Sequence, residues 1–216
     1  MPTLLELFSG THSIGKAFAE LGWDIVSLDN DPATNPTICC DLMCWDYKVF
    51  PPDAFQFVHA SPPCTMYSIA RTRGGPRDLF SADMLVDRVK EIIACFGAAN
   101  YSVENPAGGA YTLEKRGLLD DMPLFPISYC KFESPDHPYR KNSSIWSNLP
   151  LQMPPHCRKG FRCSIYSNGC HPSRAQRGTS ANPTDKSHSL SQLHSMPPQL
   201  CRIIAGCATS HASVHS

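Results

Sequence analysis

The chain lacks the features that would direct it into a membrane or out of the cell. Its 216 residues contain no run of about 20 apolar residues, which is the length that a membrane span needs. Glu6 interrupts the apolar run near the amino terminus and no cleavage site follows it, so we expect no signal peptide. We therefore expect an intracellular protein of the cytoplasm or nucleus, without a membrane partner.

The chain also has no net charge and an odd number of cysteines. Because an odd number cannot all pair and we expect a reducing compartment, the 11 cysteines should be thiols, ligands or nucleophiles and not a disulfide framework. The net charge of +0 does not by itself indicate a nucleic-acid partner. The first sixty residues are acidic, however, and residues 150–190 are basic, which suits phosphate contacts there. With 42% hydrophobic residues, we expect a folded monomer with one main domain.

Apolar runs alternate with turn signals along the first half of the chain, and this pattern predicts a parallel, doubly wound α/β sheet. The expected strands are 3–7, 25–28, 37–40, 55–60 and 101–104, and the expected helices are 13–21 and 81–98. Further strands are expected at 127–132 and 143–146, and a last helix at 199–208. We divide the chain into a core (1–148), a small irregular basic region (149–195) and a C-terminal helix that packs back on the core (196–216).

A tight turn follows the first predicted strand and leads into a helix. Its residues run from Phe8 through Ser9, Gly10, Thr11 and His12 to Ser13. Such a turn brings backbone amides close to a ligand. Asp29 ends the next strand about twenty residues on, where a carboxylate can hold the ribose hydroxyls of an adenosine cofactor. The alternative is that this segment is an ordinary turn of an α/β protein and binds no cofactor.

Two further strand ends carry reactive side chains. Ser61-Pro62-Pro63-Cys64 follows one strand, and the two prolines stiffen the loop that presents the thiol. A buried structural cysteine is the alternative for Cys64. Glu104 ends the next strand, in Val103-Glu104-Asn105-Pro106, and should lie on the same sheet edge as Cys64. It is either an acid with a raised pKa or a loop carboxylate paired with an arginine.

Together these segments resemble the cytosine-C5 DNA methyltransferase family. Leu-Glu-Leu-Phe-Ser-Gly looks like the first cofactor motif of the family, Pro63-Cys64 like its nucleophile motif and Glu104-Asn105 like its Glu-Asn motif. Their order and spacing match over most of residues 3 to 148. The resemblance implies a Rossmann-like, mostly parallel fold that binds S-adenosylmethionine. The chain is short, and its motifs depart in places from the family pattern. In both respects it is similar to the shortened family members of phages, viruses and mobile elements.

The resemblance also implies the chemistry and the roles of individual residues. Cys64 would add to carbon 6 of cytosine, Glu104 would contact the ring, and the base would be flipped out of its duplex. The turn from Phe8 to Ser13 would hold the cofactor, with Asp29 at the ribose and Asp41 at the adenine; Ser61 and Pro62 complete the expected cofactor contacts. The arginine motif of the family has a partial counterpart in Arg140, for which Lys141 is an alternative.

Basic residues in two segments, one of them the expected target-recognition region 149–195, are candidates for contacts with DNA, or with RNA as the alternative partner. The expected residues are Arg71, Arg73, Arg77, Arg158, Lys159, Arg162, Arg174 and Arg177. Solvated basic loops would have the same composition.

The cysteines and histidine of the basic region raise the question of a metal site. Cys157, Cys163, Cys170 and His171 are metal-ligand types, but they lack a Cys-x2-Cys knuckle. The adjacent Cys170 and His171 do not readily serve one tetrahedral ion. We therefore expect free thiols and no metal ligand among the site residues.

Three other functions share some of these features. An amino-methyltransferase would place an aromatic residue at the position of Cys64, and Tyr67 comes too late for that role. An RNA cytosine methyltransferase would carry the same motifs. An inactive relative that only binds nucleic acid or a partner would bind S-adenosylmethionine without forming product.

Overall fold

The structure is a computed structural model that describes residues 1–69, 71, 75–97, 99–132, 134–175 and 188–212. The expected arginines Arg73 and Arg177 lie outside the described residues. Among the helices in these ranges, none combines the length and the apolar character needed to cross a membrane.

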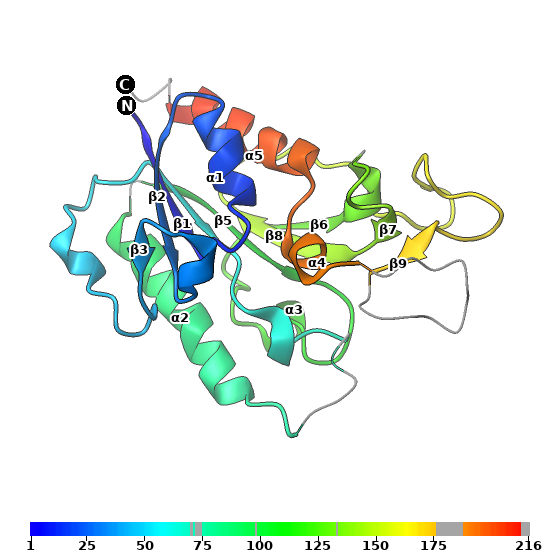
Figure 1. Cartoon of the computed structure of the whole chain (residues 1–216), viewed down its shortest axis with the longest axis horizontal. Coiled ribbons are helices and arrows are strands. Elements are labelled where there is room, and N and C mark those ends of the chain that lie inside the picture. Colours follow the sequence, from blue (N-terminus) through cyan, green and yellow to red (C-terminus); the bar gives the residue numbers. More distant parts are fainter. Residues whose placement is uncertain (70, 72–74, 98, 133, 176–187, 213–216) are drawn as a thin grey trace.

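A seven-stranded sheet forms the centre of the molecule, in the order β3-β2-β1-β4-β5-β8-β6 (Figure 1). The first five strands of this order pair in parallel, whereas β8 pairs antiparallel with both β5 and β6. The predicted doubly wound, mostly parallel α/β fold is therefore confirmed. Its strands are β1 (Thr3–Leu7), β2 (Asp24–Asp29), β3 (Ile38–Cys39), β4 (Phe57–Ala60), β5 (Asn100–Pro106), β6 (Leu124–Ser128) and β8 (Asn142–Ser147).

Helices cover both faces of the sheet because its strands bury apolar side chains on both sides. The helix α2 (Leu79–Cys95) packs on one face, where Leu5, Val58 and Val103 meet it. Two helices, α1 (Ser13–Ala19) and α5 (Pro198–Ala212), lie side by side on the other face, which Leu4 and Phe57 line (Figure 1). Alternate residues of one strand thus pack into two separate hydrophobic cores, one on each face of the sheet.

The second half of the chain departs from the expected elements. The predicted strand at 127–132 ends at Ser128, and Tyr129–Lys131 form a single 3-10 turn instead. This apolar run resembles a strand because Tyr129, Cys130 and Phe132 are all buried, although in a turn. Two short helices, α3 (Leu113–Arg116) and α4 (Leu190–His194), were not predicted.

A small two-stranded sheet ties the basic region to the rest of the chain. It pairs β7 (Tyr139–Arg140) with β9 (Ser173–Arg174) in parallel. Apart from α4, the described part of the basic region contains few other regular elements: two isolated bridges join Arg158 to Phe161 and Ser167 to Cys170. Turns rather than strands therefore shape this region.

Candidate functional site

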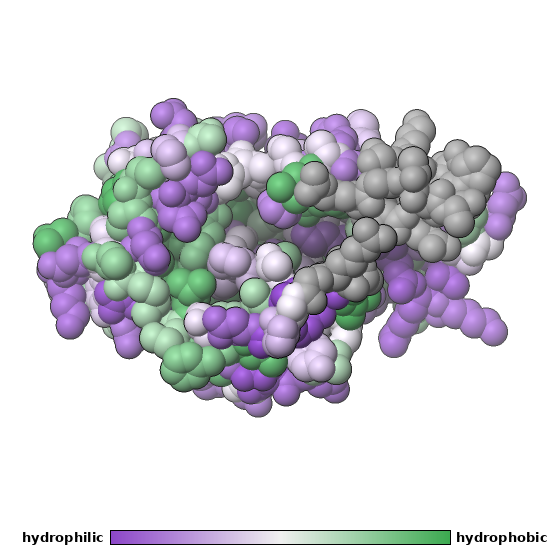
Figure 2. All heavy atoms as spheres, turned by 60° about the horizontal axis from the view of Figure 1, so that its bottom comes forward, coloured by the Kyte–Doolittle hydropathy of each residue, from purple (hydrophilic) through white to green (hydrophobic). Residues whose placement is uncertain are grey.

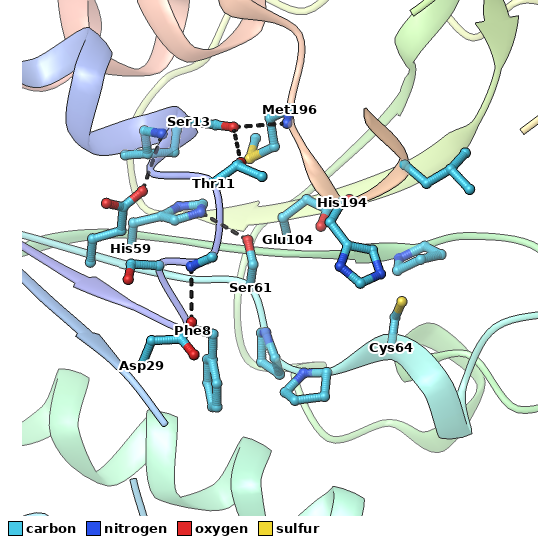
Figure 3. Close-up of a pocket in the computed structure, with 18 of the residues that line it drawn as sticks. Phe8, Thr11, Ser13, Asp29, His59, Ser61, Cys64, Glu104, His194 and Met196 are labelled. Carbon is cyan, nitrogen blue, oxygen red and sulfur yellow. Dashed lines mark hydrogen bonds between the residues drawn. The ribbon is translucent and has the colours of Figure 1, made fainter. Parts of the chain in front are cut away.

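A cavity lies at the carboxyl ends of β1, β2, β4 and β5, where open α/β sheets bind ligands. The turn after β1, the loop after β4 and Glu104 of β5 line it. Leu193, His194 and Met196, at and after the end of α4, line its other side. Figure 2 shows a hollow in the middle of one face of the molecule, and Figure 3 shows the side chains that line the cavity.

The turn after β1 has an unusual backbone. Phe8, Gly10 and His12 have φ angles of 57°, 44° and 55°, in the left-handed region. This region costs a residue other than glycine roughly 1–2 kcal/mol, and such costs concentrate at functional sites. The backbone N–H of Gly10 donates to Oδ2 of Asp29 at 2.9 Å, which holds that carboxylate at the cavity.

A second carboxylate fixes the start of α1. Glu6 is buried, and its Oε1 accepts hydrogen bonds from the backbone N–H groups of Ile14 (3.2 Å) and Gly15 (3.0 Å). These amides have no partner within their own helix, and the positive end of the helix favours an anion. Glu6 therefore sets the position of α1 against the cavity. Sequence analysis did not assign it a role.

The expected cofactor residues separate into three groups. Phe8, Ser9, Gly10, Thr11, Ser13, Asp29, Ser61 and Pro62 line the cavity. Asp41 lines a neighbouring hollow instead, which shares Phe8 and Pro63 with the cavity. His12 lines neither of them.

The described contacts of His12 lie outside both hollows. Its Nε2 lies 2.6 Å from the carbonyl oxygen of Thr34, and its Nδ1 lies 3.6 Å from Oε2 of Glu6. The contact with Glu6 raises the pKa of His12. The imidazole thus braces the turn from outside the cavity and does not face a ligand within it.

The loop after β4 presents Cys64 at the start of a 3-10 turn, Cys64–Met66. Nδ2 of the buried Asn105 donates to the carbonyl oxygen of Pro62 at 2.9 Å and ties this loop to β5. Burial raises the pKa of the Cys64 thiol, and Glu104 adds to this rise, whereas Lys141 lowers the pKa. Cys64 and His194 point into the same part of the cavity (Figure 3).

Glu104 belongs to a chain of three polar side chains. Lys141 Nζ donates to the hydroxyl of Tyr129 at 3.4 Å, and that hydroxyl donates to Oε1 of Glu104 at 3.0 Å. Burial, together with the charge of Glu104, raises the pKa of Tyr129 well above its ordinary value, so the phenol keeps its proton. One oxygen of Glu104 is thus fixed by Tyr129. Tyr129 had no expected role, because in the sequence it belongs to an apolar run.

Arg140 is not placed where the resemblance implies. It is exposed on β7 and does not line the cavity, whereas Lys141 does. The two side chains diverge because neighbouring residues of an extended chain point to opposite sides. The alternative considered from the sequence, Lys141, is therefore the cation beside Cys64.

His59 is a further polar group that sequence analysis missed. It lies buried in β4, with Nδ1 2.7 Å from Ser102 Oγ and Nε2 3.0 Å from Ser61 Oγ. Burial lowers the pKa of His59 to about 3, so the ring is neutral. A histidine inside the apolar run Phe57–Ala60 was the signal that could have found it.

The described basic residues are placed in two ways. Arg71 and Arg77 donate to carbonyl oxygens of their own loop, and Arg77 also stacks on Tyr111 at 4.7 Å. Arg158, Lys159 and Arg162 are exposed. The backbone of Arg174 belongs to β9. The side chains of Arg71, Arg77, Arg158, Lys159 and Arg162 do not line the cavity.

The chain is similar to a viral protein named "Probable DNA (cytosine-5)-methyltransferase", from Frog virus 3 (isolate Goorha). The two sequences are 34% identical over 173 residues, which cover 74% of this chain and 77% of the viral protein. No protein-family model matches the chain.

Solved structures with similar folds include two Dnmt2 proteins. The S. pombe Dnmt2 methyltransferase is 20% identical with a TM-score of 0.46, covering 68% of this chain and 50% of that one. A mutant Spodoptera frugiperda DNMT2 is 15% identical with a TM-score of 0.48, covering 81% of this chain and 58% of that one. This chain therefore spans between half and three fifths of the length of these solved proteins.

Proposed function

The chain belongs to the cytosine-C5 DNA methyltransferase family, and from this membership we propose that it transfers a methyl group from S-adenosylmethionine to carbon 5 of cytosine in DNA. The observation that carries the proposal is that Cys64 and Glu104 open onto one cavity beside the turn after β1. A thiol, a carboxylate and a cofactor turn at one sheet edge are the groups that this reaction needs.

The residues around the cavity fit S-adenosylmethionine. The hydroxyl of Ser9 is buried and, among the described residues, has no hydrogen-bond partner, so it is available to a ligand. Asp29 would hold the ribose hydroxyls, and Asp41 would hold the adenine in the neighbouring hollow. When bound, the cofactor supplies the electrophilic methyl group that carbon 5 accepts.

Cys64 is the proposed nucleophile. Its sulfur forms a bond to carbon 6 of cytosine, which makes carbon 5 electron-rich. After methylation, the proton on carbon 5 leaves, the bond to sulfur breaks and the thiolate is released. The thiolate must first form from a thiol whose pKa burial raises. Lys141 acts against that rise and therefore favours the reactive form.

Glu104 is the proposed contact for the cytosine ring, at ring nitrogen 3 and the amino group, where charge changes as the adduct forms. Tyr129 occupies one carboxyl oxygen and fixes the rotation of the side chain. A group held in place before the reaction stabilises the transition state without reorganising. Tyr129 and Lys141 are therefore positioning residues for Glu104.

We assign the contacts with DNA to the exposed basic residues of the region 149–195, above all Arg158, Lys159 and Arg162. Arg71 and Arg77 donate to carbonyl oxygens of their own loop, so their described contacts are within the protein. The target base must leave its duplex, because an enzyme cannot reach the reacting atoms of a base inside the stack.

A mechanism-based trap tests the proposal. The protein is incubated with tritiated S-adenosylmethionine and duplex DNA that carries 5-fluorocytosine, beside a Cys64→Ser variant and a Cys95→Ser variant. Cys95 is a half-buried cysteine at the end of α2, outside the cavity, and serves as the matched control. Fluorine at carbon 5 blocks the final elimination, so the covalent complex accumulates.

We expect a labelled band that survives denaturing electrophoresis for the wild type and Cys95→Ser, and no band for Cys64→Ser. A band with tRNA but not with DNA would assign the enzyme to RNA. If S-adenosylmethionine binds but neither nucleic acid gives a band, the chain is a binding protein and the proposed activity is wrong.

A further inference from the structure

Four metal-ligand side chains converge outside the cavity, near the junction of the core with the basic region. They are Cys130, Cys157, Cys163 and His171, and their ligand atoms all lie within 4.8 Å of one another. Nε2 of His171 lies 3.3 Å from the sulfur of Cys157 and 3.3 Å from that of Cys163. The three cysteines are buried.

Two tight turns bring the ligands together although the sequence has no close Cys-x2-Cys pair. The bridge between Arg158 and Phe161 closes a turn at Gly160, so the flanking Cys157 and Cys163 meet. The bridge between Ser167 and Cys170 closes a second turn, which returns the chain to His171. Gly160 and Gly169 have φ angles of 88° and 82°, which suit glycine in such turns.

Cys130 is the ligand that the sequence concealed. It lies in the 3-10 turn after β6, 27 residues before Cys157, and its side chain is buried against Cys157 and Cys163. Cys170, considered from the sequence as a ligand, is exposed and is not a member of the cluster. The objection that Cys170 and His171 are adjacent therefore does not apply to the observed set.

The apolar packing that holds this segment is small. Among the described residues, the buried cluster here consists of the three cysteines, with Ile165 and Tyr166 packed against it, and the aromatic ring of Phe161 is half exposed. An apolar core this small does not offset the entropy of ordering the turns. A bound metal ion would offset this entropy, since a structural zinc site contributes its binding free energy to folding.

We propose that Cys130, Cys157, Cys163 and His171 bind one structural zinc ion. Three cysteines and one histidine are an established ligand set for tetrahedral zinc. Bond lengths of about 2.3 Å to sulfur and about 2.0 Å to nitrogen place sulfur and nitrogen ligands roughly 3.5 Å apart. The observed sulfur–nitrogen separations of 3.3 Å are close to this distance, so a small movement of the side chains would produce the geometry of a zinc site.

The groups around the cluster suit a site of net negative charge. Three thiolates and a neutral imidazole leave a zinc complex with one negative charge, and the cations of Lys131 and Arg162 belong to the same turns. Nζ of Lys131 donates to the carbonyl oxygen of Arg162 at 3.0 Å, and Arg162 stacks on Tyr166 at 4.1 Å. The Tyr166 ring meets His171 edge-on, with centroids 5.2 Å apart, and so steadies the imidazole.

The metal content of the purified full chain tests the site, and this measurement does not depend on methylation. The test compares the wild type with Cys130→Ser, which removes a ligand, and with Cys170→Ser, its matched control one residue from His171. We expect about one zinc per chain in the wild type and Cys170→Ser, and a loss of most of it in Cys130→Ser. Equal zinc in Cys130→Ser and the wild type would overturn the ligand set.

A second pair of variants covers the case in which Cys130→Ser does not fold. His171→Cys keeps four ligands and should retain zinc, whereas His171→Ala should lose it. Cobalt added to the metal-depleted wild type should give the absorption of a tetrahedral thiolate complex. A disulfide between any two of the three cysteines in protein purified under reducing conditions, or a wild type without zinc or cobalt binding, would overturn the proposal.

Discussion

Replacement of Gly15 by alanine tests how closely Glu6 and α1 are fitted together. A Cβ at position 15 would lie 2.6 Å from Oε2 of Glu6 and 3.2 Å from Cγ2 of Ile25. The carboxylate has to move, and it then leaves the amides of Ile14 and Gly15. Each hydrogen bond to a charged group contributes about 1.5–3 kcal/mol, and alanine in a helix returns about 1 kcal/mol. We therefore expect Gly15→Ala to lower the free energy of unfolding by at least about 2 kcal/mol.

Urea denaturation measures this change, and Gly206 of α5 provides the matched control. Among the described residues outside its own helix, a Cβ at Gly206 would meet no atom within 4 Å, so Gly206→Ala should stabilise the protein by about 0.5–1 kcal/mol. In a Glu6→Ala background the clashing oxygen is absent, and the cost of Gly15→Ala should fall below about 1 kcal/mol. Stabilisation by Gly15→Ala in the wild-type background, similar to that of Gly206→Ala, would refute this reasoning.

Three further predictions concern the residues around Cys64. Asn105→Ala removes the tether to Pro62, so kcat should fall about 10- to 100-fold and by a larger factor than the affinity for S-adenosylmethionine; a change confined to the Kd for S-adenosylmethionine would contradict this. Lys141→Met removes the cation that lowers the Cys64 pKa, so the pH at which iodoacetamide alkylates Cys64 should rise; an unchanged pH profile would count against the interaction. His59 is neutral when folded and takes up a proton on unfolding, so its share of stability is present above pH 6.5 and is lost as the pH falls towards about 3. Urea titrations should give up to about 1.4 kcal/mol of lost stability per pH unit in that window, and His59→Asn should flatten this slope.

The sheet and most of the cavity could be predicted from the sequence because both depend on local patterns. Apolar runs that end in polar residues mark parallel strands, and their carboxyl ends meet at one edge. Asp29, Cys64 and Glu104 were expected at that edge for this reason, and the structure places all three at the cavity.

The parts that could not be predicted depend on contacts between distant segments. The pairing of Tyr129 with Glu104 joins residues 25 apart, and that of His59 with Ser102 joins residues 43 apart. Neither leaves a pattern of spacing in the sequence. The choice of Lys141 over Arg140 depended on the direction of one short strand, which composition does not determine.

The turn Tyr129–Lys131 has a consequence for protein engineering. Tyr129 points to Glu104, and the next residue, Cys130, belongs to the cluster with Cys157 and Cys163. A chimaera joined at residue 148, where the sequence changes character, would separate Cys130 from its partners. An exchange of the basic region between relatives should therefore carry residues 129–131 with it, so that the region is transplanted together with the turn that contacts it.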